Sequence, residues 1–304
     1  MLTKNTIGMK SSKLGNVIAL VMMTAAMSSC EKIVPSESGD LEDGEGYDVV
    51  LHVSQIETTR FGAPTRSELG DVCNHLCFDI YDEDGQKVKY INQKLDDENF
   101  GDASFSLPEG DYYLVVLAHS SAKNPSFATK EMKITTSGTL SDMFWTCEPL
   151  HISGDNVNKS LTLKRIVSMV RFVTDDKLPE EANELLVKYT GSKGTFSALT
   201  GYGTTKASQS IILDVDQSDE YYDFYMVPRD DRDTIRNVNV ISRYNDGSSA
   251  DNFSEKTIES IPVRRNCITI CRGSLFDGKS SPNGSSSVSI AIDASWNESI
   301  EVYF

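Results

Sequence analysis

The sequence lacks the short motifs by which most catalytic and metal sites can be found. Its four histidines form no His-Glu-x-x-His pair, and its six cysteines form no Cys-x-x-Cys motif. No Gly-x-Ser-x-Gly elbow, phosphate-binding loop or dinucleotide fingerprint occurs. Acidic residues are plentiful, but no spacing singles out a catalytic carboxylate pair. We therefore predict that the protein is not an enzyme and holds no cofactor or metal.

Positive charge is also scarce. Lys and Arg total 29 against 45 Asp and Glu, which gives a net charge of −16. Removing the first 29 residues, whose only charged side chains are three lysines, changes this to −16 − 3 = −19. Such acidity, without a basic stripe, argues against a nucleic-acid partner and against electrostatic docking on anionic lipid.

Long hydrophobic runs are missing as well. The main apolar run, residues 17–27 ("VIALVMMTAAM"), has about 11 residues, whereas a transmembrane helix needs roughly 20. Three lysines precede it, no acidic residue occurs before position 31, and the small residues Ser28 and Ser29 follow it. A basic region, a short apolar core and small residues are the order of a secretory signal.

Cys30 comes directly after those small residues, and "MSSC" resembles the lipobox of bacterial lipoproteins. The resemblance implies cleavage between Ser29 and Cys30, with lipid attachment at the Cys30 thiol. Two or more acyl chains hold a protein stably on a membrane, whereas one gives marginal binding. The alternative is an ordinary secretory signal that contains a cysteine, and Met9 is a second candidate start.

The remainder of the chain is predicted to be all-β. Many short alternating segments recur about every ten residues with turn residues between them, which is typical of β-sandwiches. Only 179–186 looks helical, and 57–71 is expected to be a loop. The predicted strands are 47–56, 76–80, 87–91, 112–118, 131–135, 161–173, 186–191, 210–216, 221–228, 235–244, 257–276, 288–296 and 299–304, with a short one near Phe105.

Four segments follow from this pattern. Residues 31–46 are acidic and rich in Gly, Ser and Pro, which predicts a flexible tether. The predicted organisation is a lipoprotein signal peptide at 1–29, a tether at 30–46, an N-terminal β-sandwich at 47–158 and a C-terminal β-sandwich at 159–304.

Two groups of residues could be mistaken for sites. Cys73 with Cys77, and Cys267 with Cys271, are four apart. On a strand their Cα atoms would lie about 13 Å apart, too far for a disulfide, which needs less than about 7 Å. A bridge from Cys147 to Cys73 or Cys77 remains open.

His75 and Cys77 share a predicted strand face and could bind a metal, although a structural histidine is the simpler interpretation. "DEDG" at 82–85 has Ile at both expected end positions of a calcium loop, so we predict a hairpin turn.

Three segments resemble a known family. "FSLPEGDYYLVVLAH" (105–119) resembles a turn and strand of transthyretin-like domains in fimbrial proteins of Bacteroidetes, and "LTLKRIVSMVRF" resembles the segment joining their two domains. "IPVRRNCITICRGSLF" is similar to their late RN-x-hydrophobic-T strand, with Arg265, Asn266 and Thr269 matching. With Cys30, the chain resembles the Mfa2/FimB family of fimbrial anchor lipoproteins.

The resemblance implies two tandem transthyretin-like β-sandwiches that attach a fimbria, or type V pilus, to the cell outer membrane. The expected partners are fimbrial stalk or accessory subunits, joined by strand addition, and the outer membrane itself, reached through acyl chains. Relatives in the stalk are cut by an Arg-specific protease, and Arg60 and Arg66 lie where such a cut could fall. In an anchor that cut would release the body from its lipid, so we interpret both as ordinary loop arginines.

The main rival hypothesis is a surface lipoprotein that binds glycans for a nutrient-uptake system. Exposed Trp and Tyr platforms would favour it. The chain has only Trp145 and Trp296, and Trp296 alternates with Ile290 and Ile292 as a core residue would.

Overall fold

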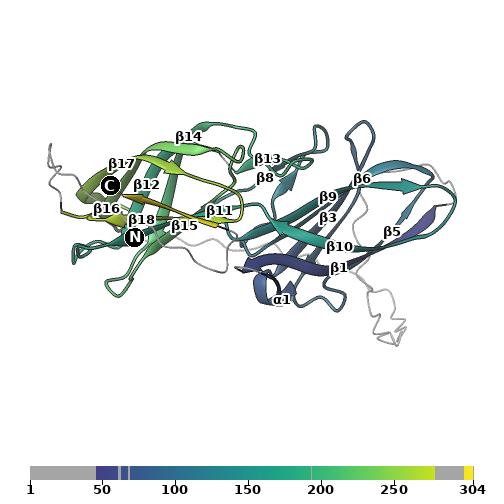
Figure 1. Ribbon diagram of the computed structural model, residues 1–304, viewed down its shortest axis with the longest axis horizontal. Helices are drawn as coiled ribbons and strands as arrows, with labels where there is room; N and C mark the ends of the chain where they lie inside the picture. The colour runs from purple at the N-terminus through teal and green to yellow at the C-terminus, as the bar shows by residue number, and fades with distance from the viewer. Residues whose placement is uncertain (1–45, 61–62, 68, 193, 278–297, 304) are drawn as a thin grey trace, which may run out of the picture. The chain divides into compact units, whose positions relative to one another are not determined.

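The described chain is almost entirely β-structure. The computed structural model describes residues 46–60, 63–67, 69–192, 194–277 and 298–303, which form strands β1–β19 and one short helix, α1 (Leu69–Val72) (Figure 1). The all-β prediction is confirmed. The predicted signal peptide, lipidation site and tether, and the predicted strand at 288–296, lie outside the described residues.

The first sandwich contains eight strands. They are β1 (Tyr47–Arg60), β2 (Ala63–Ser67), β3 (His75–Asp82), β4 (Lys87–Lys94), β5 (Asp102–Leu107), β6 (Gly110–His119), β9 (Met143–Ile152) and β10 (Val157–Arg165). Their order is β2-β1-β10-β9-β6-β3-β4, with β5 also pairing with β1. Only two residue pairs join β9 to β10, so this connection is a corner between two layers.

The first core lies between those layers. Alternate residues of β1 and β10, such as Leu51 and Leu163, meet alternate residues of β3 and β6, such as Phe78 and Val116. All four side chains are fully buried. Because successive side chains of a strand point to opposite faces, the alternation in the sequence is enough to place them.

The hairpin predicted around "DEDG" is confirmed. Strands β3 and β4 pair antiparallel, and β3 pairs with β6 on its other side. Gly85 N donates to the Asp82 carbonyl at 3.0 Å, and Gly85 has φ +71°, which favours glycine at this turn position. The Asp82 carboxylate accepts a bond from Gln86 N at 2.8 Å, so it acts as a turn residue.

The second sandwich contains two four-stranded sheets. One has the order β15-β11-β18-β19 and the other β14-β12-β16-β17. Between them lies a second core that includes Phe172, Val187, Phe224 and Val240. The strands are β11 (Ser168–Thr174), β12 (Glu184–Gly191), β14 (Ala207–Asp214), β15 (Tyr222–Met226), β16 (Thr234–Asn245), β17 (Ala250–Pro262), β18 (Cys267–Gly273) and β19 (Glu298–Tyr303).

A small third sheet joins the two halves of the chain. It consists of β7 (Ser126–Phe127), β8 (Lys133–Thr135) and β13 (Thr195–Ser197), with β8 pairing on both sides. A third hydrophobic cluster accompanies it. It brings the outer face of β3 and β6, for example Tyr81 and Leu117, together with Met169 and Ile270 of the second sandwich. The two sandwiches therefore belong to one compact unit.

The predicted loop at 57–71 is wrong. Strand β1 continues to Arg60 and pairs antiparallel with β2, and α1 follows. Arg60 pairs with Ala63 and Arg66 with Glu57, so both arginines lie on strands of a hairpin. The hairpin forms because β2 pairs with the end of β1. The Thr, Pro and Gly content of 57–71 gives no sign of that pairing.

The predicted helix at 179–186 and the single strand at 161–173 are also wrong. Residues from Glu184 belong to β12, because Leu185 and Val187 are needed in the second core. The segment 161–173 is divided into β10 and β11, and the chain passes between sheets at Ile166 and Val167. The predicted division at 158/159 falls inside β10 and stays a prediction.

Candidate functional site

The predicted histidine and cysteine positions meet in one place. His75 and His119 are directly paired across β3 and β6, and their rings stack at 4.9 Å with a 4° angle between planes. Cys77 Sγ lies 4.0 Å from His119 Nε2, which is also 3.2 Å from Asn124 Oδ1. Burial, aided by His75, lowers the pKa of His119 to about 4, so the ring is neutral at pH 7. His119 is fully buried and His75 is half-exposed, and no group of three or more metal-ligating side chains occurs among the described residues.

The other cysteines in the described part of the chain are free thiols. Cys267 and Cys271 lie at separate points of β18, as predicted. Cys73 instead lies just after α1, so the strand assumed for it is wrong, and its Sγ donates to the Leu69 carbonyl at 3.3 Å. Burial raises the pKa of Cys73 to about 12 and that of Cys147 to about 11, which makes both poor nucleophiles.

A buried ion pair lies on the outer face of β3. Lys87 Nζ is 3.0 Å from Asp79 Oδ1, and the Asp79 side chain is 2% exposed. Burial raises the pKa of Asp79 to about 6 even though Lys87 opposes the shift. Asp79 lies on the same face of β3 as Cys77 and Tyr81, which belong to the third hydrophobic cluster. The ion pair is therefore part of the packing on that face.

The carboxylate of Asp176 has a structural role. It accepts backbone N–H bonds from Leu275 at 3.0 Å, Phe276 at 2.6 Å and Asp277 at 2.8 Å. It borders a cleft of about 530 Å³ that also contains Glu180, but these three bonds use the carboxylate to hold the segment after β18.

The RN-x-hydrophobic-T segment, which carried the sequence resemblance, lies where the sandwiches meet. Arg265 stacks on the Tyr202 ring at 3.5 Å, lies 5.9 Å from the Trp145 ring, and donates to the Thr200 carbonyl at 2.7 Å. Trp145 Nε1 donates to the Ala198 carbonyl at 2.9 Å. Trp145 is therefore half-buried at a junction and does not form an exposed platform.

A second arginine completes this junction. Arg165, at the end of β10, forms a bidentate pair with Asp142, with Nε and Nη2 each 2.8 Å from a carboxylate oxygen. Its Nη1 donates to Asn266 Oδ1 at 3.0 Å. Asn266 has φ +54°, and its N–H donates to the Val167 carbonyl at 2.9 Å. Arg165 thus connects the last strand of one sandwich to the entrance of β18 in the other.

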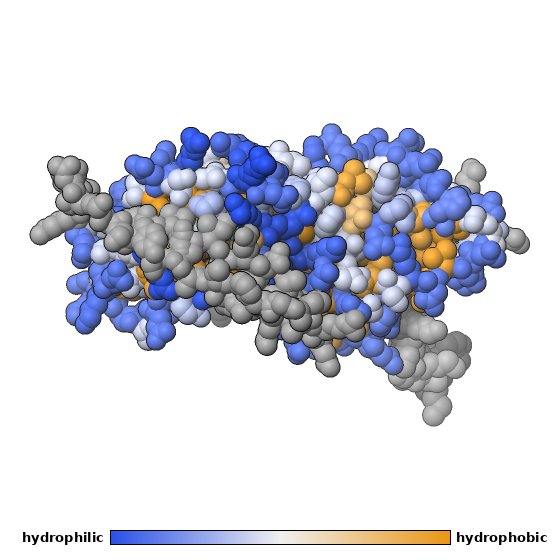
Figure 2. All heavy atoms as spheres, in the orientation of Figure 1, coloured by the Kyte–Doolittle hydropathy of each residue, from blue (hydrophilic) through white to orange (hydrophobic). Residues whose placement is uncertain are grey.

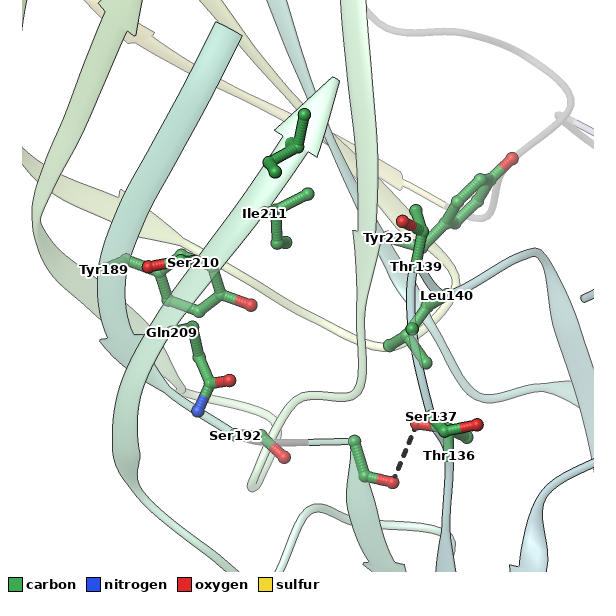
Figure 3. A pocket seen from close by; sticks show the side chains of 13 residues that line it. Thr136, Ser137, Thr139, Leu140, Tyr189, Ser192, Gln209, Ser210, Ile211 and Tyr225 are labelled. Atoms are coloured by element: carbon green, nitrogen blue, oxygen red, sulfur yellow. Dashed lines mark hydrogen bonds between the residues drawn. The ribbon is translucent and has the colours of Figure 1, made fainter. Parts of the chain in front are cut away.

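A cleft of about 560 Å³ lies between the loop 136–140 and the second sandwich (Figure 3). One wall is the loop 136–140, and the other is formed by β14 and the end of β12. The side chains of Tyr189, Ser192 and Gln209 lie on one side, facing Thr139 and Leu140 on the other. Thr136 holds the base by donating from its N and Oγ1 to the Gly194 carbonyl at 2.9 and 3.1 Å.

Two sheet edges border the cleft. Within the described chain, β14 pairs only with β12, and β15 pairs only with β11. Four consecutive residues of β14, 209–212, line the cleft together with Tyr225 of β15. Since neighbouring residues of a strand point to opposite faces, four in a row means that the strand's edge faces the cleft. Sequence analysis missed this site, because its two walls are some fifty or more positions apart and carry no motif.

The visible surface is largely hydrophilic. In Figure 2 hydrophilic side chains predominate, and hydrophobic ones form separate groups. Among the described residues, no helix is long and apolar enough to cross a membrane.

The sequence of residues 47–303 matches the model of a family of unknown function, DUF6562. The chain belongs to this family. The DUF6562 region begins at the first residue of β1 and ends at the last residue of β19. Cys30 lies outside it, so the family match does not bear on lipidation. No match was found among curated proteins.

Solved structures with a similar fold accompany the DUF6562 match. A proposed adhesin from Bacteroides ovatus is 10% identical, with 73% of this chain and 79% of that chain covered, at a TM-score of 0.48. A fimbrial assembly protein from Parabacteroides distasonis is 12% identical, with 77% and 93% covered and a TM-score of 0.41.

The fimbrial anchor protein Mfa2 from Porphyromonas gingivalis is 10% identical, with 70% and 83% covered and a TM-score of 0.41. Identities of 10–12% and TM-scores below 0.5 are too low to transfer a function to this DUF6562 member. Its membership of the Mfa2/FimB family in particular stays a prediction.

Proposed function

We propose that this protein is an outer-membrane lipoprotein that anchors a fimbria at the cell surface and thereby contributes to cell adhesion. The observation that carries the proposal is the order of segments in the sequence. A basic region and a short apolar run are followed by "MSSC", which ends at Cys30. An acidic tether comes next, and the β-sandwich strands begin at Tyr47. Acyl chains on Cys30 would hold the base of the fibre.

The lipid would carry the attachment alone. The net charge of the mature chain, −16 − 3 = −19, opposes binding to anionic headgroups. Stable anchoring therefore needs two or more acyl chains, each contributing about 0.8 kcal/mol per buried methylene.

The first strand is suited to bear load from the tether. Strand β1 has 14 residues and is paired on both sides: parallel with β10 on one, and antiparallel with β5 and β2 on the other. A pull along the strand from its N-terminal end strains these bonds together in shear. They cannot then open one at a time, so the strand resists extraction.

The junction supports the same role. Load entering through β1 must reach the second sandwich, and three kinds of contact connect the two: the β7-β8-β13 sheet, the Arg165–Asp142–Asn266 bonds and the third hydrophobic cluster. A junction of this kind resists bending better than a bare linker does.

Neighbouring subunits would join by strand addition. Within the described residues, β14, β15 and β19 each pair with a single strand, so each presents a free edge. An extended segment of another subunit can pair with such an edge through main-chain hydrogen bonds.

The test is Cys30→Ala in cells that express the full-length protein, with Cys147→Ala as the matched control. We expect Cys30→Ala to leave the membrane fraction and fibres to detach into the medium. The control keeps both in place. Mass spectrometry of the membrane-bound wild-type protein should show an acylated N-terminal Cys30.

Two results would contradict the proposal. One is a Cys30→Ala variant that stays membrane-bound after a salt wash. The other is normal fibre retention by cells in which the variant has become soluble. The second result leaves lipidation intact but removes the anchoring role.

A further inference from the structure

Strand β14 is an edge strand without the usual protection. It pairs with β12 over eight consecutive residues without a bulge, and within the described chain it has no partner on its other side. Proteins usually protect such an edge with charged residues, prolines or bulges, because an open edge can pair with another chain. The residues 207–213 include neither a charged residue nor a proline. The edge of β14 is therefore open to a second strand.

Two other edge strands show the contrast. Among the described strands, β4 and β17 each pair with one neighbour, and both ladders contain a register shift. Strand β4 has three lysines, and β17 has four charged residues. Charges and irregular pairing oppose the addition of a strand to these two edges, whereas β14 has a regular ladder and an uncharged centre.

The cleft described above leaves room beside β14. It separates residues 209–212 from the loop 136–140 by a volume of about 560 Å³, so that loop does not cover the edge (Figure 3). A strand added at the usual spacing of about 4.8 Å would lie in this cleft. The structure thus has both an open edge and the space that a paired strand needs.

The charge pattern of β14 favours a second copy of the same strand as the partner. Lys206 precedes the strand and Asp214 ends it, and both are exposed. When two copies pair antiparallel with Ser210 opposite Ser210, Lys206 of each copy lies opposite Asp214 of the other. Opposite charges directly across two strands stabilise the pair, and like charges destabilise it. Parallel pairing in register would set Lys206 opposite Lys206 instead.

The uncharged side chains match in the same register. Ser208 lies opposite Ile212 of the second copy on the outer face, where both residues are exposed. On the inner face Gln209 lies opposite Ile211, since side chains of one parity stay on one face of a strand. Ile212, which is 48% exposed, gains a cross-strand neighbour. Each copy uses the same residues, which is the geometry of a two-fold dimer.

We propose that two copies of this protein form a two-fold dimer by antiparallel pairing of β14 with β14, with Ser210 opposite Ser210. The dimer goes beyond the proposed function, because it depends on neither lipidation nor fibre anchoring. It leaves the edges of β15 and β19 for neighbouring fimbrial subunits.

The experiment is disulfide trapping of the full-length protein in the membranes of cells that express it. All variants carry Cys147→Ala, which removes the half-exposed native thiol. Opposite residues of an antiparallel pair have Cα atoms about 4.5–5.5 Å apart, within the roughly 4.4–6.8 Å that a disulfide spans. We therefore expect Ser210→Cys to give a cross-linked dimer on a non-reducing gel after mild oxidation.

Ser208→Cys is the matched control. Residue 208 is also exposed and lies on the same face of β14. Its two copies would lie four residues apart along the strand pair, about 13 Å, which is too far for a disulfide. Ser208→Cys should not cross-link by itself, whereas the double variant Ser208→Cys/Ile212→Cys should.

Charge reversal tests the identity of the partner strand. Lys206→Asp sets two acidic residues opposite each other at both ends of the pair. It should weaken dimerisation about tenfold, as measured by sedimentation of the purified full-length protein in detergent. Lys206→Asp/Asp214→Lys restores opposite charges and should restore the dimer. Because both positions are exposed, the melting temperature should stay unchanged.

The proposal is overturned if Ser210→Cys cross-links no more than Ser208→Cys, or if Lys206→Asp leaves dimerisation unchanged. It is also overturned if Ser210→Cys is trapped with a protein of different mass, because the edge then accepts another subunit. Cells that cross-link through Ser210→Cys but release their fibres contradict only the anchoring proposal. Cells that retain fibres without any such cross-link contradict only the dimer.

Discussion

Arg165 at the junction between the sandwiches gives the sharpest test of the structure. The substitution Arg165→Met keeps the length and apolar stem of the side chain but removes the guanidinium. That group makes three bonds to Asp142, of 2.8, 3.0 and 2.8 Å, and one to Asn266. The Arg165 side chain is 7% exposed and that of Asp142 is 21% exposed.

The cost follows from what the substitution leaves behind. Removing one partner of a buried ion pair costs about 3–5 kcal/mol, because the other charge stays buried without compensation. Asp142 keeps partial contact with solvent, so we expect the lower end, about 3 kcal/mol. For a unit of this size each kcal/mol lowers the melting temperature by about 2–4 °C, which gives a fall of roughly 6–12 °C.

The effect should depend on pH with a definite sign. Burial raises the pKa of Asp142 even though Arg165 lowers it, so the pKa must rise further in Arg165→Met. A carboxyl with a folded-state pKa above its unfolded value stabilises the fold at low pH and loses that contribution as pH rises. The substitution should therefore cost more at pH 8 than at pH 5, as measured by urea unfolding.

Two further variants make the test decisive. Adding Asp142→Asn to Arg165→Met removes the stranded charge and should recover much of the lost stability. The control Arg171→Met breaks a pair with Asp223 whose side chains are 21% and 23% exposed, and should cost about 1 kcal/mol. A cost below about 1 kcal/mol for Arg165→Met, or the same cost at both pH values, would refute the assigned role of Arg165.

Three other predictions concern stability. His119→Phe keeps a ring against His75 but cannot take a proton. As pH falls from 6.5 to 4, the free energy of unfolding of the wild type should drop by up to about 3 kcal/mol more than that of this variant, as measured by urea unfolding. An equal drop in both proteins would contradict the pKa of about 4 for His119. Gly201→Ala and Gly247→Ala both place a side chain at positive φ, but only at Gly201 would the methyl group lie 3.2 Å from two side chains, so calorimetry should show an extra cost of about 1–3 kcal/mol there. Deleting Ser299–Phe304 removes nearly all of the strand paired with β18, so the isolated protein should melt earlier; an unchanged melting temperature with detached fibres would mean that the strand serves a partner.

Local patterns predicted the parts of the fold that depend on local physics. The β3–β4 hairpin could be placed because alternation and a Gly-containing turn both act within some fifteen residues. Strand β9 was missed, since it contains Pro149 and alternates poorly, and it forms because β6 pairs along its whole length. Its position is set by a partner that the local sequence does not contain.

Propensity failed where tertiary contacts decide. Residues 179–186 include Glu, Ala and Leu, which favour helix, yet Glu184 begins β12. There it forms an ion pair with Arg243 of β16, while Leu185 fills the second core. The cleft was unpredictable for a related reason, because Thr139 and Ser192 come to face each other across it only after β8 and β13 have paired.

The two ends of the described chain differ in a way that fits an anchor. Strand β1 has partners on both sides, so a tether pulling from Cys30, as proposed, would load two rows of hydrogen bonds at once. Strand β19 ends the chain paired only with β18 among the described residues. An edge of that kind resists extraction less, but it leaves one row of backbone groups open to a neighbour. The anchoring proposal therefore assigns load-bearing to β1 and pairing with a neighbouring subunit to β19.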